Sequence, residues 1–179
     1  MSIPIRLQQV PLAQIDAPEA AAEVASASGL DCLEASLQAV GLINPPWLKP
    51  QPGGNRFGVV TGTRRLQAAA ALGWQEITAR LVPAGTPDLY CLLVHVMDNA
   101  FTREFNLREQ ADLAVRLLGH SDRETVAAKY LPYLGLPPSR TFLSRLVKTA
   151  GLEAPWQRLA ASGRLGLTAA ARLADWDEA

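Results

Sequence analysis

Hydrophobic and polar residues follow two different patterns along this chain, and the change of pattern divides it. Over about the first 85 residues, short β-branched and apolar runs alternate with stretches of helical spacing, and glycine or proline separates them. Beyond residue 106 every apolar pattern has helical spacing. The first part predicts the order β-α-β-β-α-β, in the segments 3–15, 31–40, 47–49, 57–61, 63–72 and 77–82. The chain is therefore expected to be an α+β protein.

We place a domain boundary near residue 105. Residues 1–105 then form a small domain with a mixed sheet, and residues 106–179 form an all-α domain that starts with Asn106 as the N-cap of a helix over 107–118. A chain of 179 residues can hold two small domains. Its 49% of apolar residues is enough for a real core and argues against wholesale disorder.

Two short helices in the second part flank a turn that contains glycine and proline. Asp122 is the predicted N-cap of the first helix and Ser139 of the second, with the turn 134–138 between them. This unit, over about 122–149, is typical of a helix-turn-helix, whose second helix enters the DNA major groove. The candidate DNA-binding residues on that helix are Ser139, Arg140, Thr141, Ser144, Arg145 and Lys148. A solvated basic face on an ordinary helical bundle is the alternative interpretation.

The charge distribution supports a polyanionic partner for the same region. The formal net charge of the chain is zero, yet basic residues outnumber acidic ones six to one in residues 134–172. Such a local excess is the electrostatic footprint of a protein that binds nucleic acid. Apolar runs stay far below the ~20 residues that span a bilayer, so we expect no membrane partner.

Residues 57–68 contain the most informative local feature. A β-branched run ends at Gly62, and a helical pattern begins at once with Arg64 and Arg65 in its first turn. A helix N-terminus offers unpaired N–H groups and the positive end of the helix dipole, so basic residues there are unfavourable for the helix itself. Their presence indicates a negatively charged ligand such as a phosphate group. A glycine turn followed by two solvated arginines is the alternative.

Three segments occur in a recognisable order ahead of the predicted helix-turn-helix. They are Gly41-Leu42-Ile43-Asn44-Pro45-Pro46, then 61–68 with Leu72-Gly73-Trp74, then Asp98-Asn99 followed by Asn106 and Glu109. Together they resemble the ParB family of chromosome and plasmid partition proteins over about residues 5–173. The resemblance implies a ParB/sulfiredoxin-like N-terminal domain followed by a helix-turn-helix domain. Family members bind cytidine triphosphate (CTP) and centromere-like DNA, and they form a sliding clamp whose opening is tied to hydrolysis.

The resemblance also assigns roles to individual positions. Asp98 and Asn99 stand where the family places an acidic and an amide residue near Mg²⁺, a cation that prefers such oxygen ligands. The helix 139–148 would enter the major groove. The residues expected to bind CTP or another nucleoside triphosphate are Gly41, Leu42, Ile43, Pro45, Gly62, Thr63, Arg64, Arg65, Asn99 and Arg103.

Two departures from the family pattern bear on turnover. Thr63 stands where the family usually has a glutamate, in Gly-Glu-Arg-Arg. The family's Glu-Asn-x-x-Arg is here Asp98-Asn99-Ala100-Phe101-Thr102, so Arg103 falls one position late, a rotation of about 100° on a helix. Both changes predict phosphate binding with weak or no CTP hydrolysis, and we assign no catalytic residue. A counterpart of the family's C-terminal dimerisation domain is not expected in this chain.

The expected function is that of a ParB-like DNA-binding protein in chromosome or plasmid partition, located in the cytoplasm with the nucleoid. We expect CTP and Mg²⁺ as ligands, and DNA, a second copy of the chain and a partition ATPase as partners. Two alternatives stay open: a non-hydrolysing DNA-binding or regulatory module, and an enzyme on the same fold such as a free-serine kinase or nuclease. Sulfiredoxin chemistry is not expected, because Thr63 occupies the position of the sulfiredoxin cysteine.

Overall fold

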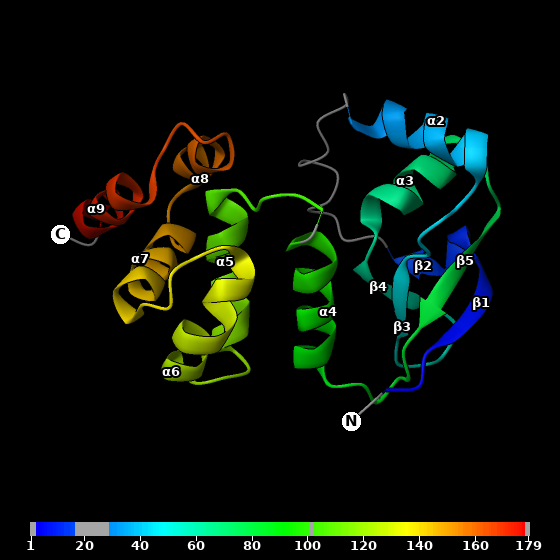
Figure 1. Ribbon diagram of the computed structural model, residues 1–179, viewed down its shortest axis with the longest axis horizontal. Coiled ribbons are helices and arrows are strands. Elements are labelled where there is room, and N and C mark those ends of the chain that lie inside the picture. The colour runs from blue at the N-terminus through cyan, green and yellow to red at the C-terminus, as the bar shows by residue number, and fades with distance from the viewer. Residues whose placement is uncertain (1–2, 17–28, 101, 178–179) are drawn as a thin grey trace. The chain divides into compact units, whose positions relative to one another are not determined.

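The described strands all lie in the first of two compact units, 1–94, and the second unit, 95–179, is helical (Figure 1). The computed structural model describes residues 3–16, 29–100 and 102–177. The division between the units falls inside helix α4 (Asp88–Ala100). The sequence had placed a boundary near residue 105, where Asn106 starts the next helix.

The first unit is built on a five-stranded mixed sheet with the strand order β1-β5-β3-β4-β2. Strands β1 and β5 pair antiparallel, as do β3 and β4, whereas β3–β5 and β2–β4 pair parallel. The bounds are β1 Arg6–Pro11, β2 Ile15–Asp16, β3 Trp47–Pro50, β4 Phe57–Thr61 and β5 Glu76–Leu81. The predicted hairpin of 47–49 with 57–61 is confirmed.

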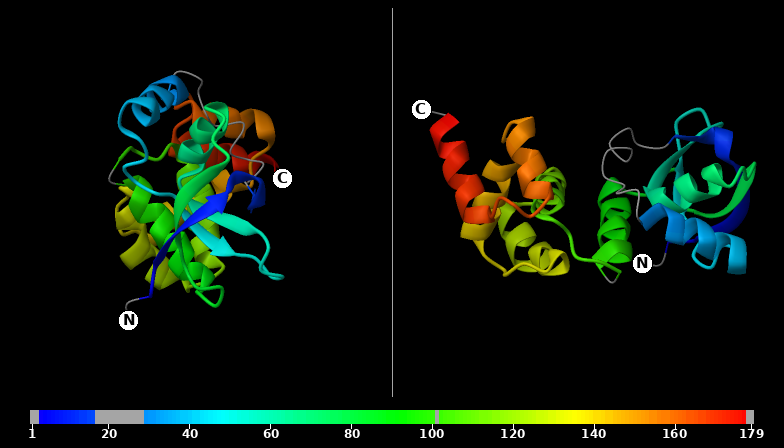
Figure 2. Two further views of the ribbon diagram at one scale, coloured as in Figure 1. Left: turned by 90° about the vertical axis from the view of Figure 1, so that its right-hand side faces the viewer. Right: turned by 90° about the horizontal axis from the view of Figure 1, so that it is seen from above.

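Helices α2 (Leu30–Val40) and α3 (Thr63–Ala71) cover the core of this sheet. They pack against each other and stay neighbours in both views of Figure 2. Each helix contributes buried apolar side chains to one cluster with the strands, because helical and alternating spacing each direct apolar residues to one side. The buried members of that cluster are Val10, Leu37, Leu48, Phe57, Leu66, Ala68, Ala69, Ile77 and Ala79.

The second unit is a helical bundle in which α5, α6 and α7 begin at the predicted caps. Asn106 forms a capping box with Glu109, Asp122 accepts a hydrogen bond from Thr125 N, and Ser139 accepts one from Phe142 N. The bounds are α5 Leu107–Leu118, α6 Arg123–Thr125, η3 Val126–Tyr130, η4 Leu131–Leu134, α7 Arg140–Ala150, α8 Ala154–Ala161 and α9 Leu167–Asp177.

Helix α7 lies at the centre of this bundle and packs against α5 and α9. Its side chains Leu143 and Leu146 are fully buried, together with Leu117 of α5 and Leu131 of η4. Burial of one apolar stripe leaves the opposite stripe of α7 exposed to solvent. Within the described part of the chain, every helix is too short or too polar to cross a membrane.

Candidate functional site

The turn between β4 and α3 is made by Gly62, which has φ 98° and ψ 21°. A Cβ atom on Gly62 would lie 2.8 Å from Pro46 Cβ and 3.0 Å from Pro46 Cα. Glycine is therefore required here twice, for the left-handed backbone and for the close approach of the Pro46 segment. This contact brings the loop 41–46 to the N-terminus of α3.

Arg65 fastens that loop from the first turn of α3. Its Nη1 donates to the carbonyl oxygen of Asn44 at 2.7 Å and approaches that of Pro45 at 3.5 Å. Gly41, with φ 74°, ends α2 at the other end of the loop. Two of the three segments that the sequence singled out are thus brought together by a glycine contact and an arginine.

The expected nucleotide-binding residues of the loop differ in exposure. Leu42 packs against the core cluster and Pro45 is half-buried, whereas Ile43 is 73% exposed. The loop therefore has a fixed base and an apolar side chain that faces solvent, where a ligand can contact it.

Arg64 precedes Arg65 in the same helix turn, about 100° away around the axis, and is exposed. Its guanidinium packs against Gly29, the N-cap of α2, so closely that a Cβ on Gly29 would collide with it. Neither α2 nor α3 has a side-chain cap at its N-terminus. Within the described ranges, Arg64 has no hydrogen-bond or ion-pair partner.

This arrangement concentrates positive potential at one point of the first unit. Two helix N-termini meet there, each with unpaired backbone N–H groups and the positive end of its dipole. The first turn of α3 contains no acidic residue and Arg64 adds a full positive charge, whereas the first turn of α2 contains the acidic Asp31. An anion with several oxygen atoms, such as a phosphate group, would satisfy both the N–H groups and the guanidinium. The half-buried Thr63 adds a hydroxyl but no carboxylate.

Asp98 and Asn99 lie on α4, in the second unit. Asn99 Nδ2 donates to the carbonyl oxygen of His95 at 2.8 Å, so its Oδ1 is the amide atom suited to a cation. The described residues contain no cluster of three or more His, Cys, Asp or Glu that could hold a metal by themselves. A carboxylate and an amide oxygen fit Mg²⁺ that arrives with substrate phosphates, since Mg²⁺ commonly takes only one or two protein ligands.

Arg103, the last expected nucleotide ligand, is held by the start of α5. Its two Nη atoms pair with the two carboxylate oxygens of Glu109, each at 2.7 Å, and its guanidinium lies 5.2 Å from the centre of the Phe105 ring. Burial raises the pKa of Glu109, but the hydrogen bonds from Arg103 and Asn106 N and the Arg103 charge together outweigh burial and lower the pKa. Glu109 thus joins the segment before α5 to the helix.

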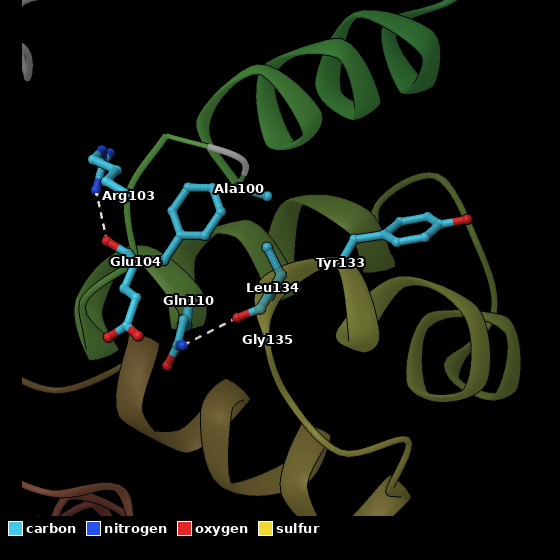
Figure 3. A pocket seen from close by; sticks show the side chains of 8 residues that line it. Ala100, Arg103, Glu104, Gln110, Tyr133, Leu134 and Gly135 are labelled. Carbon is cyan, nitrogen blue, oxygen red and sulfur yellow. Dashed lines mark hydrogen bonds between the residues drawn. The ribbon is translucent and has the colours of Figure 1, made fainter.

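A cavity of about 240 Å³ lies beside this ion pair in the second unit (Figure 3). Gln110 Nε2 donates across it to the carbonyl oxygen of Leu134 at 3.2 Å. None of the residues 62–65 contributes to it. Its lining consists of Ala100, Arg103, Glu104, Phe105, Gln110, Tyr133, Leu134 and Gly135.

The candidate DNA-binding residues share the solvent-facing side of α7. Arg140, Thr141, Ser144 and Lys148 are exposed and Arg145 is half-buried, whereas Ser139 uses its hydroxyl to cap the helix. Arg140 Nη2 pairs with Glu124 Oε2 at 2.6 Å, and Lys148 Nζ pairs with Asp175 Oδ1. Sequence reasoning missed both acids because they come from other helices and follow no spacing rule.

Comparison with known proteins identifies the family. The model of the ParB N-terminal domain matches residues 4–99, more than half of the 179 residues. The chain belongs to the ParB N-terminal domain family. No curated protein sequence matches it significantly.

Solved structures show the same fold at low sequence identity. A pNOB8-like ParB-N domain is 16% identical, with a TM-score of 0.59 over 97% of this chain and 80% of that chain. The C-terminally truncated chromosome-partitioning protein ParB from Caulobacter crescentus, complexed to the centromeric parS site, is 21% identical, with a TM-score of 0.53 over 93% of this chain and 84% of that chain. These likenesses establish the α+β, ParB-like fold.

The first prediction concerns the contact of Gly62 with Pro46. Gly62→Ala should reduce the free energy of unfolding by more than Gly73→Ala does, because Gly73 also has a positive φ, 75°, but has nothing within 4 Å of an added Cβ. We expect roughly 1–2 kcal/mol for the left-handed backbone in either variant. The collision with Pro46 should add about 1–3 kcal/mol to Gly62→Ala. Urea unfolding measures both, and equal losses would contradict the role given to Pro46.

The second prediction concerns the Glu109 carboxylate. Because its pKa is lowered in the folded protein, its contribution to stability is complete above the unfolded pKa of about 4.3 and is lost as pH falls through the folded pKa. Glu109→Gln should therefore destabilise the protein by about 1 kcal/mol at neutral pH and flatten its acid sensitivity. Glu104→Gln, which removes an exposed neighbouring carboxylate, is the control. Thermal melts from pH 7 down to pH 3 test this, and parallel pH profiles for both variants would contradict it.

Proposed function

We propose that this chain is a nucleotide-responsive DNA-binding protein of the ParB type, acting in chromosome or plasmid partition. It binds a nucleoside triphosphate at the N-terminus of α3 and DNA through α7. The observation that carries the nucleotide half is Arg64: an exposed guanidinium at two uncapped helix N-termini, with no partner among the described residues. Family membership supports the assignment, and CTP is the nucleotide that the ParB resemblance implies.

The residues of the proposed site have different roles in nucleotide binding. Arg64 and the N–H groups at 62–64 contact the phosphates, and the Thr63 hydroxyl is a further donor. Arg65 holds the loop 41–46 through the Asn44 carbonyl group, so that the loop presents Ile43 to the nucleotide. A site whose loop is already fastened loses less conformational entropy when the ligand binds.

Mg²⁺ fits the same proposal through two residues of α4. The Asp98 carboxylate and the Asn99 Oδ1 atom would hold the ion, which neutralises phosphate charge when bound. Arg103, the further proposed nucleotide ligand, forms two hydrogen bonds with Glu109. Any phosphate contact of Arg103 would have to compete with that ion pair.

We expect the site to hydrolyse the nucleotide weakly or not at all. Hydrolysis needs a group that orients or deprotonates the attacking water. Thr63 places a hydroxyl where the family usually has a carboxylate, and Arg103 is paired with Glu109. These two observations favour a protein that binds the nucleotide and uses it as a regulatory ligand.

The DNA half of the proposal rests on the segment from α6 to α7. We interpret it as a helix-turn-helix in which Gly135, with φ 73°, makes the turn and α7 enters the major groove. Thr141 and Ser144 then face base edges, and the basic residues, Arg145 among them, contact phosphates. A second copy of the chain and a partition ATPase are the proposed partners, and a cytoplasmic location on the nucleoid follows from a chromosomal or plasmid DNA partner.

The third prediction tests the phosphate site. Arg64→Ala should weaken binding of CTP with Mg²⁺ by about 10–150-fold, because a hydrogen bond to a charged group contributes about 1.5–3 kcal/mol. Gly29→Ala should weaken binding while leaving the melting temperature nearly unchanged, since its Cβ displaces only the flexible end of Arg64. Isothermal titration calorimetry measures the affinities.

Two controls make this test specific. Gly85→Ala adds a methyl group with nothing within 4 Å, and Arg158→Ala removes an exposed arginine of α8. Both variants should bind CTP like the parent protein. If the parent protein shows no binding of CTP, with or without DNA, the nucleotide half of the proposal is wrong.

The fourth prediction tests the DNA half. Arg145→Ala should weaken binding to duplex DNA and lower the slope of log K against log salt by about 0.9, the value for one phosphate contact. Arg6→Ala, a change at an exposed arginine of β1 in the other unit, should leave both quantities unchanged. Fluorescence anisotropy at several salt concentrations gives the slopes. Equal slopes for Arg145→Ala and the parent would remove α7 from the interface.

A further inference from the structure

The basic residues at the two ends of α7 are each paired with an acid from a neighbouring helix. Arg140, in the first turn, pairs with Glu124 of α6, and Lys148, in the last turn, pairs with Asp175 of α9. Arg145 lies between them and forms no ion pair among the described residues. The face proposed to meet DNA therefore has compensated charges at its ends and an uncompensated one near its middle.

These two ion pairs are poor devices for stabilising the fold. The side chains are 71% and 73% exposed in the Arg140–Glu124 pair, and 44% and 51% exposed in the Lys148–Asp175 pair. Ion pairs that are this exposed contribute little to stability because solvent screens them. The dipole of α7 also does not account for both acids. It disfavours Arg140 at the N-terminus, where Glu124 offsets the effect, but it favours Lys148 at the C-terminus, where no compensating acid is needed.

We propose that Glu124 and Asp175 restrain the binding of α7 to DNA, and this inference rests on the DNA half of the proposed function. Each carboxylate forms an ion pair with a basic side chain of α7 that would otherwise contact a DNA phosphate. A DNA duplex must displace the carboxylate before it gains that contact, and the acids remain as negative charges beside the DNA backbone.

The restraint lowers the affinity of α7 for DNA of any sequence, and its consequence is largest where phosphate contacts are all that holds the duplex. Non-specific binding depends almost entirely on phosphate contacts and the release of counterions. A duplex of the correct sequence also gains base-edge contacts, which are independent of Arg140 and Lys148. Weakening the phosphate contacts at both ends of α7 therefore leaves a duplex without the correct base edges weakly bound, whereas base-edge contacts still hold a duplex of the correct sequence.

The test is the affinity of Glu124→Gln and Asp175→Asn for a fluorescent duplex of random sequence, measured over a range of salt. Each variant should bind about eight-fold more tightly than the parent at about 0.1 M salt, with a slope of log K against log salt steeper by about 0.9. Asp112→Asn is the matched control, since it removes an exposed acid that is paired with Arg108 on α5 and not with α7. It should bind like the parent.

A double-mutant cycle identifies the route of the effect. Glu124→Gln should gain nothing when Arg140→Ala is already present, because the freed cation is gone. Melting temperatures verify that each variant folds, and Glu124→Asp and Asp175→Glu, which keep the charge, should behave like the parent.

The outcomes separate this inference from the proposed function. If the parent binds DNA but the two variants bind equally or more weakly, the acids do not restrain binding and the inference is wrong. An equal gain in Asp112→Asn would reduce the effect to net charge and overturn it as well. Absence of parent binding even at the lowest salt would instead overturn the proposed DNA-binding function.

Discussion

The close approach of Gly62 to Pro46 is the constraint on which the candidate nucleotide site depends. The left-handed turn at Gly62 starts α3 directly after β4, and the missing side chain lets the loop 41–46 reach the helix N-terminus. Arg65 then has loop carbonyl groups within hydrogen-bond distance, and Arg64 is left on the exposed side of the turn. A single position without a Cβ atom thus lets Arg65 hold the loop 41–46 while Arg64 stays exposed to solvent.

Arg64 and Arg140 both lie in the first turn of a helix, but only Arg140 is paired with an acidic side chain among the described residues. Arg140 stands in the first turn of α7, where the dipole disfavours it, and Glu124 compensates for it. Arg64 stands in the first turn of α3, beside the N-cap of α2, and forms no ion pair among the described residues, although Asp31 lies in the first turn of α2. The unpaired guanidinium of Arg64 favours our proposal that a nucleotide phosphate binds there. The ion pair of Arg140 favours our proposal that Glu124 lowers the affinity of α7 for DNA phosphates.

Local features of the structure could be predicted from the sequence, and contacts between distant segments could not. The caps Asn106, Asp122 and Ser139 and the turn at Gly62 depend on neighbours within a few residues, so residue type and spacing reveal them. The bond from Arg65 to Asn44 spans 21 positions, and the pair of Lys148 with Asp175 spans 27. The pairing of Arg103 with Glu109 is closer in sequence, yet the resemblance had assigned this arginine to the nucleotide. Only the folded chain shows which of several possible partners each charged side chain takes.

The most direct test of the central claim is a crystal structure of the protein with Mg²⁺ and CTP-γ-S, in which anomalous scattering locates the thiophosphate sulfur. We expect the phosphate oxygens to lie within hydrogen-bond distance of the Arg64 guanidinium and of the backbone N–H groups at the start of α3. We also expect Arg65 still to donate to the Asn44 carbonyl group. A nucleotide found only in the cavity beside Arg103 and Tyr133, with the N-terminus of α3 unoccupied, would contradict the account.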